Sequence, residues 1–524
     1  MHPDTAHERR WLALAVLCLS LLLVVLDNTI LNVALPTLVD ELDASTSDLQ
    51  WIVDSYVLVF AGLLLTAGSL GDRYGRRRSL TAGLVVFGIG SVLAAFSGSS
   101  SELISTRALM GLGAAFVMPA TLSIITNLFT DPKERAQAIA AWAGTAGLGV
   151  AIGPVTGGWL LEHFWWGSVF LVNVPFLLLA LAAGRYLLPE SRDPEQPRLD
   201  LVGASLSIVG LTILLWTLIE APEAGWTSTE TIAGFATATV VLGAFVWWER
   251  RSDHPMLDVT FFQDRRFSVA TGSITLVMFA MFGSFFVLTQ LLQFVMGYSA
   301  LQAGIRMLPV AGTMFVVAPA SAKLVEKVGT KAVVGSGMAI VSVGLLLVAR
   351  IGLDDGYGEM AAAMVVLALG MALVMAPATE AIMGSLPPAK AGVGSAVNDT
   401  TRELGGALGV AVLGSILSSG YSSSVSAAVA GTPVPEQVRS VVEESLGAAI
   451  GVANQIGGNA GAQLTEVARS AFVDGMGLTL VIAAAVAAAG SLLTFLFLPS
   501  RATVAAPDEN EIVEEVPALA LEAA

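Results

Sequence analysis

The sequence predicts an all-α integral membrane protein of about fourteen spans, arranged as two six-helix bundles with a two-helix insertion. Apolar residues make up 55% of the 524-residue chain and charged residues 13%, whereas a soluble domain carries about 25% charged residues. Most apolar residues fall in runs of roughly 18 or more, each long enough to cross about 30 Å of hydrocarbon. A loop motif that follows the second run also recurs after the tenth. This composition excludes a soluble enzyme.

The apolar runs and the residues that break them place the individual spans. The first run contains Asp27 and Asn28 and no signal-peptide cleavage site, so we interpret it as an uncleaved span. One cysteine, Cys18, and four scattered histidines leave no disulfide and argue against a metal site. We expect spans near residues 11–36, 50–71, 79–97, 103–128, 136–161, 166–188, 200–220, 230–249, 267–294, 302–325, 331–351, 359–385, 392–420 and 473–498.

The distribution of basic residues predicts the orientation in the membrane. The connections between spans fall into two sets, and one set carries nearly all the Lys and Arg. The connections on the opposite side carry Arg439 and Arg469 in one long loop, and otherwise acids such as Glu41 and Glu102. Because loops rich in Lys and Arg stay in the cytoplasm, we expect both termini there, which requires an even number of spans. The basic set comprises Arg9, Arg10, Arg73, Arg76, Arg77, Arg78, Lys133, Arg135, Arg192, Arg198, Arg250, Arg251, Arg265, Arg266, Lys327, Lys331 and Lys390.

An internal repeat predicts the domain organisation. The order acid, base, glycine, base in Asp72–Arg76 recurs 254 residues later in Glu326–Lys331. Repeated bundles of this kind build alternating-access carriers, whose substrate site lies near the midplane between the halves. We therefore expect a cytoplasmic N-terminus (1–10), an N-terminal bundle (11–190), an inserted hairpin (200–249), a C-terminal bundle (267–498) with an outer loop (421–472), and a disordered acidic cytoplasmic tail (499–524). The outer loop has helical patches at 436–449 and 459–471, and it is either a helical hairpin over the outer mouth or a flexible loop.

Two glycine motifs are candidates for conformational roles. The first is the loop GSLGDRYGRRR, whose glycines permit a tight turn and whose Asp72 can cap the next helix or pair with a base. A plain positively charged loop is the alternative. The second, in the fifth span, combines closely spaced glycines with a kinking proline, and fits either a hinge or simple helix packing. The residues concerned are Gly68, Gly71, Asp72, Arg73, Gly75 and Arg76, and Gly149, Gly153, Pro154, Gly157 and Gly158.

Ionisable residues inside the spans are the candidates for transport chemistry. A charge at mid-bilayer costs at least about 2.5–3.5 kcal/mol, so such residues usually face a cavity or a partner. Asp399 and Glu403 share a helix face with Arg402 nearby, and two carboxylates so close together favour proton uptake. Asp27 and Arg107 fit either this chemistry or a buried structural ion pair. Further candidates are Asp54, Arg306 and Glu380, and Glu380 fits a structural role equally well.

The ninth span carries aromatic residues that could stack on flat or cationic compounds, although packing in the core or against lipid is the commoner fate. These are Phe279, Phe282, Phe285 and Phe286, beside Gln290 and Gln293. No GxxxxGK[ST] phosphate loop occurs, so ATP is not the expected energy source. No selectivity-filter motif indicates a channel. The remaining source of energy is an ion gradient.

Together these elements resemble the fourteen-span drug:proton antiporters of the major facilitator superfamily, of the QacA and LfrA type. The resemblance covers nearly the whole chain. It rests on LDNTILNVALP (26–36), WIVDSY (51–56), the loop at 68–78, the spacing from Arg107 to Gly111 and Gly113, the Gly-Pro-Gly-Gly kink (153–158), FLVNVPF (170–176) and HPMLD (254–258).

The resemblance implies proton-coupled efflux of hydrophobic cations, dyes or antibiotics. By position, it links Asp27, Asp54, Arg107, Asp399 and Glu403 to protonation or substrate recognition. The chain departs from the pattern in three places: Met110 replaces a frequent glutamine, Thr313 replaces an acid found in exporters of dications, and Asn398 replaces one of two adjacent acids. For substrate contacts we predict Asp27, Asp54, Tyr56, Phe285, Phe286, Gln290, Glu380 and Asp399.

We therefore predict a bacterial inner-membrane exporter without a cofactor. It would be driven by the proton gradient, carry small-molecule drugs, bind no nucleic acid and act as a monomer without an obligate protein partner. Protons and drug would compete for the same carboxylates. One alternative is an exporter dedicated to a single antibiotic, lipid or siderophore. The other is a non-transporting receptor or sensor on the same scaffold.

Overall fold

The structure, a computed structural model, describes residues 9–42, 44–194, 199–353, 355–429 and 436–500. Within these residues the secondary structure is helical and contains no strand. In the described part of the chain, fourteen helical segments are long and apolar enough to cross a membrane, so the predicted fold class is confirmed. Residues 501–524 of the tail predicted at 499–524, and residues 1–8, lie outside the described residues. We name the end of the molecule that holds the loop at 71–78 the inner end, and the opposite end the outer end.

The first bundle is built from antiparallel helices joined by short turns. Ser45 and Asp48 form a reciprocal capping box at the start of α3, and Asp131 caps α6 ahead of Pro132 at its first position. Gly75 separates α3 from α4 with φ at 115°, a conformation that favours glycine. The helices are α2 (Arg10–Leu42), α3 (Thr46–Tyr74), α4 (Arg76–Ala95), α5 (Ser100–Leu128), α6 (Pro132–His163), α7 (Ser168–Leu171) and α8 (Asn173–Leu187).

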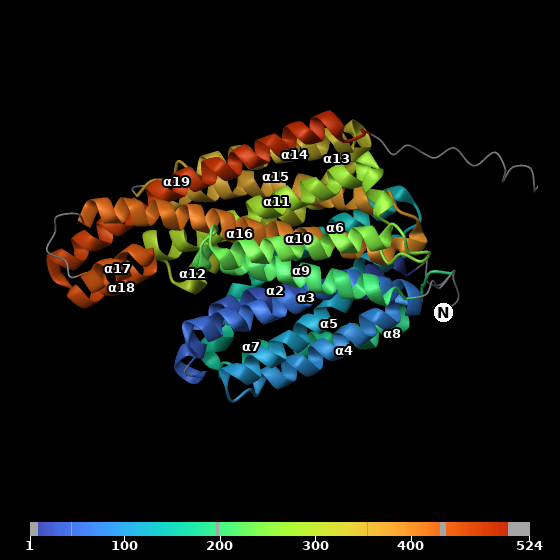
Figure 1. Ribbon diagram of the computed structural model, residues 1–524, viewed down its shortest axis with the longest axis horizontal. Coiled ribbons are helices and arrows are strands. Elements are labelled where there is room, and N and C mark those ends of the chain that lie inside the picture. Colours follow the sequence, from blue (N-terminus) through green and yellow to red (C-terminus); the bar gives the residue numbers. More distant parts are fainter. Residues whose placement is uncertain (1–8, 43, 195–198, 354, 430–435, 501–524) are drawn as a thin grey trace, which may run out of the picture.

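An inserted hairpin follows, formed by α9 (Leu201–Ala224) and α10 (Thr229–Glu249). In Figure 1 these two green helices lie between the blue first bundle and the orange second bundle. Helix α9 packs on both α3 and α16. The hairpin therefore lies along the seam between the bundles.

The second bundle repeats the first. Its helices are α11 (Arg265–Gln290), α12 (Ala300–Arg306), α13 (Leu308–Val328), α14 (Thr330–Val348), α15 (Tyr357–Met383), α16 (Ala391–Val429), α17 (Glu436–Glu444), α18 (Leu446–Ile456) and α19 (Gly458–Phe497). Short turns at η1 (Val259–Gln263), η2 (Leu291–Val295) and η3 (Pro388–Lys390) complete the described elements. The amide of Thr330 donates to the carbonyl of Ser500, so the described chain ends at the inner end. Helix α2 also begins at the inner end (Figure 1).

The internal repeat extends to the helix crossings. A Cβ added to Gly83 would lie 2.7 Å from the carbonyl oxygen of Gly113, and one added to Gly337 would lie 3.0 Å from that of Gly370. Both pairs bring neighbouring helices into backbone contact, α4 with α5 and α14 with α15. Because lipid removes the hydrophobic drive for helix association, such close packing carries much of the stability. Gly83 and Gly337 are 254 residues apart, the offset of the loop repeat.

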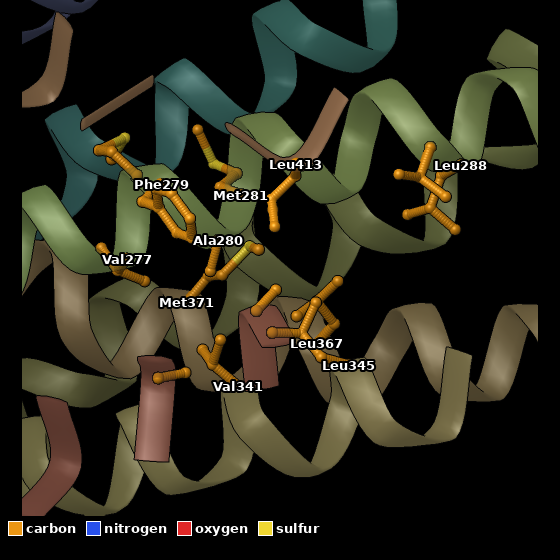
Figure 2. Packing of buried hydrophobic residues seen from close by; sticks show 14 of the residues in the cluster. Val277, Phe279, Ala280, Met281, Leu288, Val341, Leu345, Leu367, Met371 and Leu413 are labelled. Carbon is orange, nitrogen blue, oxygen red and sulfur yellow. The ribbon is translucent and has the colours of Figure 1, made fainter. Parts of the chain in front are cut away.

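The buried apolar side chains form one large cluster in each bundle. Figure 2 shows part of the second cluster, in which Val277 of α11, Val341 of α14 and Met371 of α15 gather between the helices. These three side chains are at most 1% exposed. Most members of each cluster belong to one bundle, and a few side chains, such as Leu65 in the second cluster and Ala322 in the first, join the cluster of the facing bundle.

The segment predicted as an outer loop (421–472) is largely helical. Helix α16 continues to Val429 and α19 begins at Gly458. Ser445 caps α18 and so divides the helical patch predicted at 436–449 into α17 and α18. The Tyr421 hydroxyl donates to the carbonyl of Val442 at 3.0 Å, and Arg469 donates to that of Phe294 at 2.9 Å. These bonds fix the segment on its own bundle.

Candidate functional site

A buried ion pair lies within the first bundle. Arg107 Nη1 on α5 lies 2.5 Å from Asp27 Oδ2 on α2, and the two side chains are 0% and 1% exposed. Asn173 Nδ2 donates to Asp27 Oδ1 at 2.9 Å. The guanidinium also lies 4.3 Å from the ring centre of Tyr56 and donates to the carbonyl of Ile52. Asp27 and Arg107 thus form a buried ion pair, which is one of the two interpretations that the sequence allows.

A glycine explains how Arg107 reaches this position. Gly111 lies one turn further along α5, and a Cβ there would lie 2.5 Å from the carbonyl oxygen of Tyr56. The absence of a side chain lets α5 approach α3 closely, so that the guanidinium can contact the Ile52 carbonyl and the Tyr56 ring. The spacing of Arg107 and Gly111 therefore has a structural reason.

The second bundle presents a different acid cluster on α16. Asp399 is 1% exposed; its Oδ1 accepts from Asn398 Nδ2 at 3.1 Å, and its Oδ2 has no hydrogen-bond partner. Among the described residues, no basic nitrogen lies within 4.0 Å of Asp399 or Glu403. Arg402 instead donates to Thr379 Oγ1 at 3.1 Å. An acid pair without a direct basic partner, in a low dielectric, is suited to take up a proton or a cation.

The two clusters face each other across the bundle interface. The Arg402 guanidinium lies 5.0 Å from the ring centre of Trp142 on α6 of the first bundle. Glu403, which is half-buried, interacts electrostatically with both Asp399 and Tyr56. Of the two acids, Glu403 is the more accessible. The central group therefore combines Tyr56 and Trp142 from one bundle with the acids of α16 from the other.

The inner end is closed by contacts that we call the inner gate, made by Asp72, Arg76, Arg135, Glu380 and the segment 388–393. Asp72 accepts from the amides of Gly392 and Val393 at 2.9 and 3.0 Å. These amides begin α16, and a helix N-terminus favours an anion. Arg76 pairs with Asp72 at 2.6 Å.

Further hydrogen bonds and close backbone contacts complete the inner gate. Arg76 donates to the carbonyls of Pro388 and Ala389, both at 2.8 Å. A Cβ on Gly68 would lie 2.5 Å from the carbonyl oxygen of Gly392. The loop motif is thus a contact between bundles and more than a positively charged turn. Of its other members, Gly71 lies beside Ser79, and the Arg73 guanidinium lies 5.3 Å from the ring centre of Tyr74.

Glu380 lies in the inner gate and away from the central group. Its carboxylate is 2.9 Å from Arg135 Nη2 of the first bundle, with side chains 14% and 17% exposed. The predicted drug contact at Glu380 therefore has no support from its position, whereas the structural interpretation has.

We expect Glu380→Arg to weaken the inner gate, because it sets two positive charges against each other. Losing a half-buried pair and adding like-charge repulsion costs on the order of 2–3 kcal/mol. The initial rate of the efflux that the sequence predicts should fall at least about tenfold. The exchanged variant, Glu380→Arg with Arg135→Glu, should recover most of that rate; if it does not, the pair does not hold the inner gate.

The glycine and proline motif of α6 packs against α2 in the outer half of the bundle. Gly149 lies against Val25, Gly153 against Thr29 and Gly157 against Ile30. Gly158 faces Leu301 of the second bundle, and a Cβ on Gly304 would lie 2.6 Å from that of Pro154. The motif therefore brings three helices into close contact, as the packing interpretation requires. A hinge at Pro154 stays a prediction.

Asp54 lies in a separate recess near the outer end. It faces Glu220 of α9, and the walls include Gln50, Trp51 and Trp216. The two indole rings lie 4.8 Å apart. Asp54 and Glu220 interact electrostatically. The inserted hairpin thus supplies Glu220 to this recess, an acid that the sequence marks only as the last residue of a predicted span.

The aromatic residues of α11 lie along its contact with α16. Phe282 packs on Gly406 and Phe286 on Gly414, and these rings are 43% and 39% exposed. Phe285 is half-buried against the apolar cluster. Gln290 ends α11, where the helix widens into η2. Drug contacts at Phe285, Phe286 and Gln290 stay predictions.

Sequence reasoning missed three residues of the site. Trp142 is buried, with its indole nitrogen donating to Thr121 at 3.1 Å, and Thr379 links Arg402 to Asn398. Asn173 was noted only as part of a motif. The signal available for Trp142 was a single indole in the Ala- and Gly-rich segment Ala140–Gly149. Thr379 and Asn173 are ordinary polar residues whose partners are distant in sequence, and they gave no signal.

Three comparisons bear on this arrangement. Residues 17–410 match the family model described as Major Facilitator Superfamily. The chain is 40% identical to the multidrug efflux pump LfrA of Mycolicibacterium smegmatis, over 92% of this chain and 95% of that one. It is 32% identical to the tetracenomycin C resistance and export protein of Streptomyces glaucescens, over 96% and 94%. The crystal structure of the human organic anion transporter MFSD10 is similar in fold, with a TM-score of 0.61, 16% identity and coverage of 93% and 99%.

Proposed function

The chain belongs to the major facilitator superfamily, and from this membership we propose that it exports hydrophobic, often cationic drugs in exchange for protons. It is a multi-pass membrane protein and not an enzyme. We place it in a bacterial inner membrane with its inner end in the cytoplasm, because the basic loops gather at that end. Similarity to LfrA and to the tetracenomycin C export protein along nearly the whole chain supports drug efflux.

The observation that carries proton coupling is the acid pair on α16. Asp399 is buried with one oxygen unpartnered, Glu403 is half-buried, and no base neutralises either directly within the described residues. When both are ionised, a lipophilic cation is attracted to the central group, where Tyr56 and Trp142 offer ring faces. When they are protonated, that attraction is lost and the cation leaves. Proton and drug thus exclude each other at the same oxygens.

The closed inner gate defines the step that the structure represents. The hydrogen bonds and ion pairs between Asp72, Arg76 and Arg135 and the second bundle join the inner ends. We infer that, while these contacts hold, the central group exchanges ligands with the outer face. Loading of drug from the cytoplasm requires these contacts to break, and the two bundles can then tilt relative to each other.

The proposed energy source is the proton gradient, with no cofactor. Each proton that moves inward through 100 mV yields about 2.3 kcal/mol, and a pH difference adds to this. The acids of α16 are the groups that would carry the proton through the central group, and no nucleotide is required.

A narrower function is favoured by one observation. The tetracenomycin C export protein bears the name of a single antibiotic, and its alignment covers 96% of this chain. An exporter of one compound would protect cells against that compound and its analogues only. A multidrug exporter would protect against chemically unrelated cations, so a panel of such compounds separates the two functions.

The test of the proposed function is dye efflux from cells that express the chain. We expect cells preloaded with a cationic dye to lose it faster than cells with an empty vector. A protonophore should abolish the difference within minutes. Equal efflux from both cell types across a panel of dyes would contradict drug export, and protonophore-resistant efflux would contradict proton coupling.

A further inference from the structure

Helix α9 of the inserted hairpin packs on both bundles, against α3 and α16. Near the outer end, the Trp226 indole donates to Ser415 Oγ of α16 at 2.9 Å. Further in, Leu215 packs in one cluster with Leu58 of α3 and Leu404 of α16. A hairpin attached only to lipid would show neither contact. Its connections to the bundles at the inner end are the most polar of all.

The first connection, residues 188–194, lies against the loop motif of the first bundle. The Asp193 amide donates to the carbonyl of Asp72 at 2.7 Å, and the Arg76 amide donates to that of Ser191 at 2.9 Å. Glu190 lies 3.7 Å from both Arg77 and Arg78. This connection is therefore fixed to the same residues that form the inner gate.

The Asp193 side chain extends the contact to the second bundle. Its Oδ2 lies 3.1 Å from Lys390 Nζ, in the turn that precedes α16, and the side chains are 2% and 32% exposed. Water solvates a carboxylate this well buried only poorly, so removal of its lysine partner costs more than the loss of a surface ion pair.

The second connection reaches the same place. Glu249, at the end of α10, accepts from the Leu257 amide at 3.1 Å. Pro255 and Met256 then line a recess whose walls also include Asp72 and Lys390. Both ends of the inserted hairpin thus meet at the inner gate (Figure 1).

We propose that Asp193, within the connection 188–194, is a positioning residue that holds the inner gate closed by pairing with Lys390 across the bundles. Opening of the inner end moves the segment 388–393 away from Asp72 and must break this pair. The inserted hairpin, held on the seam by Trp226 and Leu215, keeps Asp193 in place. The hairpin therefore stabilises the outward-facing state.

A cysteine-accessibility measurement tests this proposal without reference to any cargo. Cys18→Ser removes the native thiol, and Ser69→Cys places a reporter in the wall of the recess beside Asp72. A membrane-impermeant thiol reagent is applied to the inner face of the full-length protein in vesicles. We expect Asp193→Asn to raise the labelling rate about five- to tenfold, as loss of a contact that biases two states should. Lys390→Gln should raise it similarly.

The double variant and a matched control make the result specific. Asp193→Asn combined with Lys390→Gln should label no faster than either single variant, because both remove the same interaction. Glu190→Gln removes an acid from the same connection whose partners lie in its own bundle, so its labelling rate should equal that of the parent. Unchanged labelling of Asp193→Asn, additive effects in the double variant, or an equal effect of Glu190→Gln would overturn the proposal. None of these outcomes depends on whether the exported compound is a drug.

Discussion

Asp399→Asn combined with Glu403→Gln is expected to abolish drug-driven proton release from acid-loaded vesicles. Both variants keep the shape of the side chains but remove the titratable oxygens, so the central group can neither attract a cation nor bind the counter-transported protons. Removing a buried charge partner costs about 2–5 kcal/mol, at least about 30-fold in affinity. The measurement is the pH change inside the vesicles on addition of a lipophilic cation, with the loss of drug affinity read in parallel.

A matched control separates position from charge. Asp355 and Glu359 have the same sequence spacing as Asp399 and Glu403, but they lie on the outer surface at the start of α15. Asp355→Asn with Glu359→Gln should leave proton release unchanged. Proton release that survives the double substitution on α16 would show that the exchange takes place elsewhere.

Arg107→Met is expected to destabilise the first bundle strongly. It leaves Asp27 buried without its cationic partner, with Asn173 as its remaining hydrogen-bond partner in the described part of the chain, and breaking a buried pair in this way costs about 3–5 kcal/mol. The unfolding midpoint of the purified protein in detergent should fall accordingly. The measurement is thermal unfolding followed by the intrinsic fluorescence of tryptophan.

Asp27→Asn with Arg107→Gln should recover most of the lost stability, since neither charge then remains. This folded double variant also decides between the two interpretations of the pair. Proton-coupled efflux that persists in it would assign Asp27 and Arg107 to structure alone, and efflux that is lost would assign them to coupling. A double variant as unstable as Arg107→Met would contradict the account of the pair.

The spans could be predicted from the sequence because lipid forces each of them to be long, apolar and helical. The helical patch predicted at 459–471 is the first part of α19, but its continuity with the last span could not be predicted, nor could the extension of α16 to Val429. The extension of α16 is rich in Ser and Ala and has low hydropathy, so the helix continues beyond the end of the apolar run. The cap at Ser445 needed only local hydrogen bonds, yet its serine is one of many in that segment.

The charged residues inside the spans were predictable as a set, but their pairing was not. Arg107 and Asp27 are 80 residues apart, and Glu380 and Arg135 are 245 apart. Insertion cost identifies such residues one by one, whereas only the folded bundles show which of them meet. Glu220 and Asp193 were not predicted as site residues. Glu220 lies at the end of a predicted span and Asp193 in a connection between spans, where an acid carries no membrane-insertion cost and so gives no signal.

The mutual exclusion of proton and drug on Asp399 and Glu403 is the central claim, and it can be measured without any transport. Purified protein in a weakly buffered detergent solution near neutral pH is titrated with a lipophilic cation while a pH dye is read. Displacement of protons by the cation should acidify the solution in proportion to occupancy, and Asp399→Asn with Glu403→Gln should show no such signal. Saturating binding to the parent protein without any release of protons, tested from pH 6 to 8, would contradict the exchange.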